Sequence, residues 1–378
     1  MTTAEQPSGF VPPPYPYDLL NEVRADAAAR HDSVVDLSIG TPFDPPPAAV
    51  IEALASGASA RSYPPSVGTP AFHDAVRSWL DRRFGVTIER SQVGATIGSK
   101  EFVASLPQYM ALRDPSKDTV LYPAVSYPSY EMGATLAGLR AVKVPLRPDG
   151  GGLDLDAVEL SDRERALLLW CNSPGNPTGH LEDLEAVATW GRSHGIPVFS
   201  DECYIEFTWR GPGRTILEHG LDGVVAVHSL SKRSNFAGAR AGFYCGDGDI
   251  VEYLREVRKH AGMMVPGPVQ AAACLALDAD ADVAAQRDRY LSRLNLMAEV
   301  LSDWSQSPAN VPAGAFYLWV RVDDAWEFTR RLARDGGAIA SPGDFYGVEG
   351  ADHVRVAVVQ PDEYIETVAT RLRAHREA

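Results

Sequence analysis

The sequence is poor in cysteine, in lysine and in long apolar runs, and each shortage excludes a class of protein. Four cysteines in 378 residues are too few for a disulfide scaffold, and no CxxC pair indicates a zinc site. No apolar run reaches the length of a membrane helix, and the start, MTTAEQPSGF, lacks the basic and apolar regions of a signal peptide. We therefore expect a soluble cytoplasmic protein that binds neither a metal ion nor a membrane.

Positive charge is also scarce. The chain has 35 Lys and Arg residues against 50 Asp and Glu residues, a formal net charge of −15. Nucleic acids and anionic membranes are bound through clustered basic side chains, so this balance argues against both partners. If the chemistry needs an amine nucleophile, it must use one of only five lysines, namely Lys100, Lys117, Lys143, Lys232 and Lys259.

Short apolar segments alternate with helical patterns through the middle of the chain. Because these segments lack polar alternation, we expect strands that are buried on both faces, which is typical of a largely parallel sheet covered by helices. Seven strands are predicted, at residues 93–97, 119–122, 141–144, 166–171, 197–200, 224–230 and 241–245. Together they predict a large α/β domain.

The two ends of the chain follow a different pattern. A long amphipathic helix is predicted over residues 282–304, and strands and shorter helices follow it. Near the start, FVPPPYP (10–16) predicts an extended arm that lies on another surface, often a partner subunit. A short helix is predicted over 17–30 and a strand over 34–40. We assign residues 45–278 to the large domain, and residues 1–44 and 279–378 to a smaller α+β domain with the arm.

Three motifs follow predicted strands of the large domain. NSPGNPTG begins at Asn172, SDECY at Ser200, and HSLSKRSNFAGARAGF at His228. Ligands of open parallel sheets collect at the carboxyl ends of strands, so each motif lies where a site is expected. Each motif alone also has an ordinary explanation: a turn, a helix cap and a solvated surface lysine. Lys232, however, follows a buried strand and lies between serines.

Together the motifs resemble those of the pyridoxal-phosphate-dependent aminotransferases of fold type I, class I/II. NxPxNPTG, [ST]DExY and SxSKxxxxxGxRxG occur in the family's order and spacing, and the similarity extends over essentially the whole chain. The resemblance implies an α/β fold of type I with a mostly parallel seven-stranded sheet and a smaller α+β domain. It also implies pyridoxal 5′-phosphate as cofactor, a ping-pong transamination through a pyridoxamine form, and a homodimer with shared active sites.

The resemblance implies a role for each motif residue, and the chemistry explains the residue types. An amine of lowered pKa is needed to bind the cofactor's aldehyde and later to carry a proton, which is the implied role of Lys232. A buried carboxylate keeps the cofactor's ring nitrogen protonated, which is the implied role of Asp201. Asn176 and Tyr204 would hold the cofactor's phenolic oxygen.

The cofactor's phosphate needs cations and the amides of a helix N-terminus. TIGSKEFVASL (96–106) predicts a strand that passes through Gly98 into a helix beginning near Ser99, although an ordinary glycine turn and cap has the same pattern. The backbone amides of Ser99 and Lys100 would face the phosphate. By resemblance, the other phosphate ligands are Ser229, Arg240 and, lent to the neighbouring subunit, Tyr63.

An aromatic ring and a forked cation complete the expected site. Tyr127 in PAVSYPSYE matches the family's YPxY pattern and would lie on the cofactor ring, and we expect Tyr130 to pack in the core behind it. Arg355 lies within an apolar predicted strand, where an unpaired charge is costly, and matches the arginine that binds the substrate α-carboxylate. Gly40 matches the glycine whose backbone approaches the same carboxylate.

A finer resemblance concerns the substrate. VDLSIGTPFDPPP, SDECYIEFTW and VRKHAGMMVPGPVQAA resemble the actinobacterial N-succinyl-LL-diaminopimelate aminotransferases of lysine biosynthesis, which use 2-oxoglutarate as the partner substrate. Such polyanionic substrates need a second cation. The sequence does not choose among Lys100, Arg258, Lys259 and His260, for each of which a plain surface role is also open.

Several alternatives stay open. Aspartate, aromatic and LL-diaminopimelate transaminases share every cofactor residue named above, and so do carbon–sulfur lyases. A transcription regulator with an aminotransferase-like domain is not expected, because only about 30 residues precede the first predicted strand, too few for a DNA-binding domain. A non-catalytic scaffold is not expected either, because Lys232 and Asp201 are both present.

Overall fold

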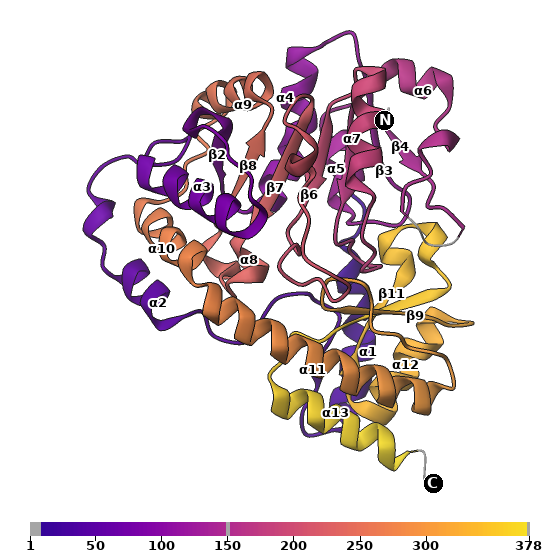
Figure 1. Ribbon diagram of the computed structural model, residues 1–378. Helices are drawn as coiled ribbons and strands as arrows, with labels where there is room; N and C mark the ends of the chain where they lie inside the picture. The colour runs from indigo at the N-terminus through magenta and orange to yellow at the C-terminus, as the bar shows by residue number, and fades with distance from the viewer. Residues whose placement is uncertain (1–8, 149–151, 376–378) are drawn as a thin grey trace, which may run out of the picture.

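A computed structural model describes residues 9–148 and 152–375 of the chain. Its centre is a seven-stranded sheet of order β2-β8-β7-β6-β5-β3-β4 (Figure 1). Its strands are β2 (Val93–Thr96), β3 (Thr119–Pro123), β4 (Arg140–Val144), β5 (Ala166–Asn172), β6 (Val198–Asp201), β7 (Val224–Ser229) and β8 (Gly242–Gly246). Every pairing is parallel except those of β8, which runs antiparallel to β2 and to β7. The predicted α/β fold of type I, with a mostly parallel seven-stranded sheet, is confirmed.

Helices cover both faces of this sheet because its central strands are apolar on both sides. β5 reads ALLLWCN and is buried along its whole length. One hydrophobic cluster joins the sheet to α3 (Pro70–Phe84), α7 (Leu184–His194) and α10 (Gly267–Asp278). A second cluster, on the other face, joins it to α4 (Ser99–Arg113), α5 (Ser129–Leu136) and α9 (Gly248–His260). Three shorter helices are α2 (Ala48–Ala55), α6 (Leu160–Arg165) and α8 (Leu230–Arg233).

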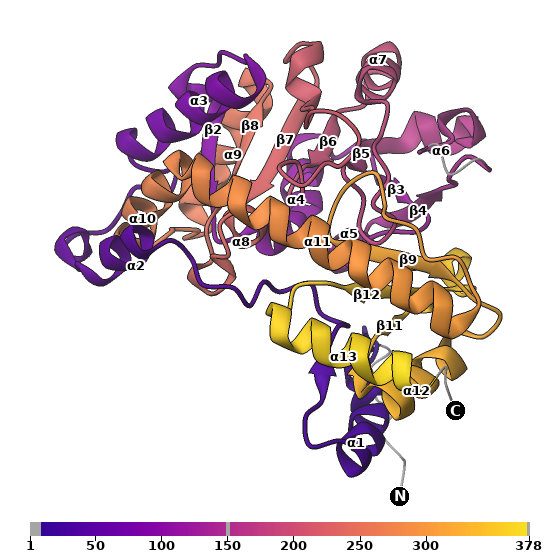
Figure 2. The ribbon, with the colours of Figure 1, turned by 60° about the horizontal axis from the view of Figure 1, so that its bottom comes forward.

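A second layer, built mainly from the carboxyl-terminal part of the chain, packs below the large sheet in Figure 1. Its antiparallel sheet has the order β11-β12-β9, from β11 (Ser341–Pro342), β12 (His353–Ala357) and β9 (Tyr317–Arg321). Its helices are α1 (Asn21–Arg30), α11 (Asp280–Ser305), α12 (Ala325–Gly336) and α13 (Asp362–Ala374). Figure 2 shows α11 crossing from the end of α10 to this layer.

The N-terminal segment packs against the carboxyl-terminal layer. β1 (Val35–Asp36) pairs in parallel with β10 (Ala338–Ile339), and α1 packs against α12. β1 is shorter than the predicted strand over 34–40, because the backbone amide and hydroxyl of Ser38 both bind the Asp36 carboxylate and turn the chain. The proposed boundaries, 45–278 against 1–44 and 279–378, stay a prediction.

Short 3-10 turns connect many of these elements. They are η1 (Pro16–Leu20), η2 (Ala58–Ala60), η3 (Arg90–Gln92), η4 (Leu155–Ala157), η5 (Ile216–His219), η6 (Ala237–Ala239), η7 (Gly343–Tyr346) and η8 (Val348–Gly350). The predicted helix over 17–30 is therefore split, with η1 beginning at a proline and α1 continuing from it. Within residues 9–148 and 152–375, no helix has the length and apolar character of a membrane span.

Candidate active site

A cavity of about 370 Å³ lies between the carboxyl ends of the central strands and the carboxyl-terminal layer. Most of the site residues expected from the sequence line it: Gly40, Ser99, Lys100, Tyr127, Asn176, Asp201, Tyr204, Ser229, Lys232, Arg240 and Arg355. Tyr63 does not line this cavity, and its side chain is 93% exposed. One chain therefore brings together every expected site residue except the one expected to serve a neighbouring subunit.

Lys232 lies on the one-turn helix α8, at the end of β7. The hydroxyl of Ser229 accepts a hydrogen bond from the Ser231 amide at 3.2 Å and so caps the start of this turn. The lysine amine donates to the carbonyl oxygen of Gly40. Enclosure by protein lowers the pKa of Lys232 to about 8, so the uncharged amine is much more abundant near neutral pH than at an exposed lysine.

Asp201 lies at the end of β6 and is 6% exposed. Its Oδ1 accepts from the Cys203 amide at 3.2 Å, and its Oδ2 accepts from the Tyr130 hydroxyl at 2.9 Å. Burial raises the pKa of Asp201, and the hydrogen bonds from Cys203 and Tyr130 oppose that rise. The cavity thus holds a buried carboxyl group that a cationic ring nitrogen could pair with.

Tyr130 has a role that the sequence did not reveal. It is fully buried and stacks on Trp170, with 5.1 Å between the ring centroids, as the core prediction requires. Its hydroxyl nevertheless reaches Asp201, and the side chain also lines the cavity. The available signal was the hydroxyl itself, because a buried phenol needs a hydrogen-bond partner.

One end of the cavity lies at the start of α4. Gly98 precedes the helix with φ = 71°, and a β-carbon there would overlap the guanidinium of Arg240. Arg240 itself has φ = 60°, a strained conformation for a residue with a side chain. Its guanidinium binds the carbonyl oxygens of Ala237 and Ile97 at 2.9 and 3.4 Å and pairs with no acidic side chain among the described residues. A cation without a counterion beside helix amides fits a phosphate group.

The opposite end of the cavity is formed around Arg355 of β12, which is 2% exposed. The guanidinium carbon lies 4.2 Å from the ring centroid of Tyr317 and 4.7 Å from that of Tyr346. Nη1 donates to Asn176 Oδ1 at 2.7 Å, and Nη2 donates to the Ser38 carbonyl oxygen at 2.5 Å. In the described part of the chain Nε has no acceptor and no carboxylate pairs with the side chain. A buried arginine with an unused N–H fits a carboxylate ligand.

The four candidates for a second substrate cation separate clearly. Only Lys100 lines the cavity, with its amine 5.4 Å from the ring centroid of Tyr15. Both predictions for Arg258 are wrong. It is not a surface residue, because it is 1% exposed, and it is not a free cation, because its guanidinium forms a bidentate ion pair with Glu101. Lys259 pairs with Glu256 on the surface, and His260 is exposed away from the cavity.

Aromatic side chains from both ends of the chain also reach the cavity, and no sequence motif predicted them. Tyr15, at the end of the arm, lines this chain's own cavity, although the arm was expected to lie on another surface. The Tyr17 hydroxyl lies 3.4 Å from Arg355 Nη2 and 3.2 Å from the Tyr346 hydroxyl. The hydroxyls of Tyr317 and Tyr204 lie 2.8 Å apart. No local pattern marks these residues, because their partners are far away in sequence.

Comparison with known proteins gives consistent results. The family model described as aminotransferase class I and II matches residues 32–372. A probable aminotransferase of Mycobacterium tuberculosis is 40% identical, over 95% of this chain and 85% of its own length. The 4-dedimethylamino-4-oxo-anhydrotetracycline transaminase of Streptomyces rimosus is 39% identical, over 95% and 99%. The structure of a probable N-succinyldiaminopimelate aminotransferase from Thermus thermophilus superimposes with a TM-score of 0.84 at 32% identity, over 95% and 100%.

Proposed function

The chain belongs to the class I and II aminotransferases, and from this membership we propose that it uses pyridoxal 5′-phosphate to move an amino group between an amino acid and 2-oxoglutarate. One observation carries the proposal: a single cavity holds the Lys232 amine with its lowered pKa, the buried Asp201 carboxyl, and Arg355, which pairs with no carboxylate among the described residues. Lys232 would bind the cofactor's aldehyde and carry the proton, Asp201 would pair with the protonated ring nitrogen, and Arg355 would bind the substrate α-carboxylate.

The side chains support binding of the cofactor at each of its polar groups. The amides of Ser99 and Lys100, with Ser229 and Arg240, would hold the phosphate, and Lys232 would bind the aldehyde. Asp201 would keep the ring nitrogen protonated, Tyr127 would lie on the ring, and Asn176 and Tyr204 would donate to the phenolic oxygen. When bound, the cofactor supplies an aldehyde for the amino group and a ring that withdraws electrons from the substrate's Cα.

The chain's own residues would then bind and deprotonate the substrate. Arg355 would hold the α-carboxylate, with the backbone of Gly40 close to it, and so fix the orientation of Cα. The Lys232 amine, once free, would take the proton from Cα and deliver it to the cofactor carbon that had carried the aldehyde. Lys232 serves this step because an enclosed amine is partly uncharged near neutral pH.

For the substrate we propose N-succinyl-LL-2,6-diaminopimelate, an intermediate of lysine biosynthesis. Two observations support it: Lys100 provides a cation in the cavity that pairs with no described carboxylate, and a similar structure carries the name of an N-succinyldiaminopimelate aminotransferase. A second candidate is a bulky cyclic oxo compound, because the Streptomyces rimosus relative is named for an oxo-anhydrotetracycline and Tyr15 and Tyr17 offer flat apolar surface at the cavity.

A panel of amino donors with 2-oxoglutarate tests the proposal of a succinylated donor. We expect glutamate to form with N-succinyl-LL-diaminopimelate and far more slowly with aspartate, aromatic amino acids and unsuccinylated LL-diaminopimelate. Lys100→Gln should raise KM about tenfold for the succinylated donor only, and Lys259→Gln, a change on the far surface, should leave KM unchanged. Equal rates with every donor would defeat the narrow proposal, and pyruvate with ammonia from cystathionine would indicate a carbon–sulfur lyase.

We also propose a homodimer with shared sites. The support is Tyr63, a tyrosine that is 93% exposed on its own chain, is followed by two prolines and lies outside its own cavity. If Tyr63 serves the neighbouring cavity, a mixture of Tyr63→Phe and Lys232→Ala subunits forms hybrid dimers with one wild-type site. Recovered activity in the mixture is the expected result, and none would count against shared sites.

A further inference from the structure

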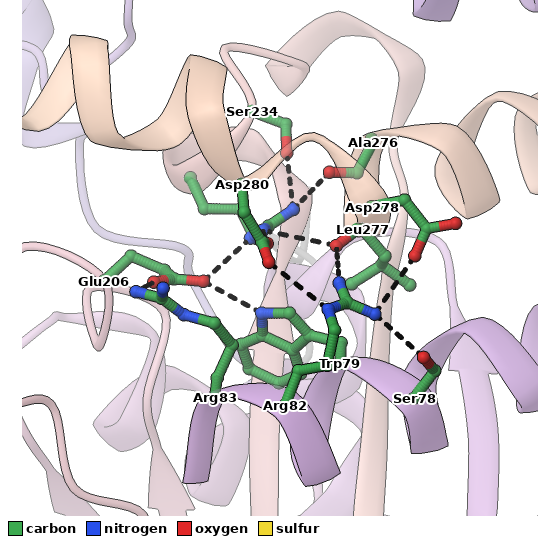
Figure 3. Close-up of polar contacts among 11 residues, drawn as sticks. Ser78, Trp79, Arg82, Arg83, Glu206, Ser234, Ala276, Leu277, Asp278 and Asp280 are labelled. Carbon is green, nitrogen blue, oxygen red and sulfur yellow. Dashed lines mark hydrogen bonds and ion pairs between the residues drawn. The ribbon is translucent and has the colours of Figure 1, made fainter.

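A buried network of charged side chains lies beside Lys232 but outside the cavity. Its centre is the next residue, Arg233, which is 5% exposed. Arg233 donates from Nε to Glu206 Oε1 at 3.2 Å and from Nη2 to Asp280 Oδ1 at 3.4 Å, and its Nη1 binds the carbonyl oxygen of Ala276 near the end of α10. Figure 3 shows Glu206, Ala276 and Asp280 arranged around this point, between α3 and the junction of α10 with α11.

Glu206 connects the network to the loop after β6. It is 4% exposed and accepts from Trp79 Nε1 at 2.8 Å and from Arg83 Nη2 at 2.7 Å, both of α3. In sequence it lies two residues after Tyr204 and five after Asp201. The Arg233–Glu206 pair therefore joins the loop that carries Asp201 and Tyr204 to the turn that carries Lys232.

The turn that carries Lys232 has little structure of its own to hold it in place. α8 is four residues long, and an isolated helical turn of that length is unstable. Asn235, directly after the turn and Ser234, has φ = 50°, so no helix continues beyond it. Side chains must therefore help to hold the turn in place, and Arg233 does so through hydrogen bonds to Glu206, Asp280 and the Ala276 carbonyl oxygen.

Stability alone does not explain a buried ion pair here. Taking an arginine and a glutamate out of water is costly, and apolar side chains of similar volume often stabilise a core equally well. Arg233 and Glu206 are both nearly fully buried, and each has several hydrogen-bond partners. Arg233 is next to Lys232 in sequence, and Glu206 is in the same loop as Tyr204, so the pair adjoins two residues that line the cavity.

We propose that Arg233 is a positioning residue, which with Glu206 fixes the Lys232 amine relative to Asp201 and Tyr204. This proposal rests on the proposed function for the role of Lys232. Arg233 itself touches neither cavity nor substrate, and it acts through the backbone that it shares with the lysine. Loosening the turn should let water reach the amine, bring its pKa back toward that of an exposed lysine, and misplace it for proton transfer.

The test compares Arg233→Met with Arg82→Gln. Arg82 binds the same helix junction, through Asp278, Asp280 and the Leu277 carbonyl oxygen, but it lies on α3 and is not attached to the lysine turn. The first measurement is competitive labelling of the full chain by acetic anhydride across pH, with Lys232 followed by peptide mass spectrometry. The second is the steady-state kinetics of the reconstituted enzyme, and melting temperature is recorded for each variant.

Arg233→Met should raise the labelling pKa of Lys232 by at least about half a unit. Its kcat should fall about tenfold or more, with KM for the amino donor within about twofold of wild type. Arg82→Gln should change neither the labelling pKa nor kcat, even where it lowers the melting temperature. The proposal is overturned by an unshifted pKa and kcat in Arg233→Met, or by equal shifts in Arg82→Gln.

If Arg233→Met does not fold, Glu206→Gln provides a second test of the positioning role of Arg233. The amide oxygen can still accept from Trp79, but an NH2 group replaces the oxygen that accepts from Arg83, and the charge that holds Arg233 is removed. The same shifts are therefore expected at smaller size, and their absence overturns the proposal. Labelling needs no cofactor. A wild-type chain without transaminase activity would therefore defeat the proposed function, while the labelling result would still decide whether Arg233 positions Lys232.

Discussion

The floor of the cavity and the end that holds Arg355 are built in different ways. Its floor, made of Asn176, Asp201, Ser229 and Lys232, comes from the carboxyl ends of neighbouring strands, β5 to β7, and the loops directly after them. Its arginine end, made of Arg355, Tyr17 and Tyr317, comes from the two termini of the chain and lies in the carboxyl-terminal layer. The floor is thus a property of one sheet, whereas the arginine end exists only when distant segments pack together.

The floor and the arginine end also differ in their electrostatics. In the floor, burial acts on both titratable groups, lowering the pKa of Lys232 and raising that of Asp201, so each is moved toward its uncharged form. At the arginine end one permanent cation is held by aromatic rings and neutral oxygens, with no carboxylate partner in the described chain. Under the proposed function, the floor would provide the proton chemistry and the arginine end would orient the substrate.

Lys232→Ala removes the amine from the floor of the cavity and should have the largest effect on kcat of the variants considered. Without the amine, no side chain remains to carry the proton at Cα, and kcat should fall by about a thousandfold or more. Transamination of the best donor in the panel is the measurement, and Lys259→Ala, a lysine paired with Glu256 on the surface, is the control. Turnover near the wild-type rate in Lys232→Ala would remove the floor from the chemistry.

Arg355→Lys tests the other side of the comparison. A lysine keeps the charge but loses the forked geometry, so KM for the amino donor should rise by about ten- to a hundredfold. Cofactor affinity should stay unchanged, because the phosphate end lies across the cavity. Arg321→Lys is the matched control, since that arginine is in the same antiparallel sheet and its side chain is 81% exposed. An unchanged KM in Arg355→Lys would contradict the division into a floor and an arginine end.

Much of the floor could be predicted from the sequence, because each of its residues lies in a contiguous motif after a recognisable apolar strand. Residues 172–179, 200–204 and 228–243 therefore gave both the site and its place on the sheet. Arg355 was also recognisable as a charge within an apolar strand. Its tyrosines were not, because Tyr17 and Arg355 are separated by 338 positions and no local pattern connects them.

Like the tyrosines around Arg355, the buried ion pairs could not be predicted from the sequence. The sequence left Arg258 open as a substrate cation or a surface residue, yet its side chain is buried and pairs with Glu101, 157 positions away. The choice between a solvated arginine and a buried pair depends on tertiary packing and not on the residues next to it. The same reason hid the partner of the Tyr130 hydroxyl, although burial of the ring itself was predicted.

Tyr130→Phe tests the floor of the cavity separately from the arginine end, and its effect should be smaller than those of Lys232→Ala and Arg355→Lys. It removes one hydrogen bond to the ionised form of Asp201, so the pKa of Asp201 should rise further. Since the carboxylate is then lost at a higher pH, the acid limb of the kcat–pH profile should move upward, and kcat should fall about three- to tenfold. KM should not change, because Arg355 is untouched.

The control for Tyr130→Phe is Tyr253→Phe, which removes a hydroxyl that donates to the Tyr109 carbonyl oxygen at 2.8 Å outside the cavity. Its pH profile should superimpose on that of the wild type. A shifted KM with an unshifted profile in Tyr130→Phe would mean that Tyr130 acts on the substrate and not on Asp201.

The account as a whole depends on a covalent link between the Lys232 amine and pyridoxal 5′-phosphate. Borohydride reduction of the reconstituted full chain, followed by digestion and mass spectrometry, tests that link directly. The account predicts loss of the yellow colour and one phosphopyridoxyl adduct, on the peptide that contains Lys232. A reduced adduct on the peptide of any other lysine, or no adduct at all, would contradict it.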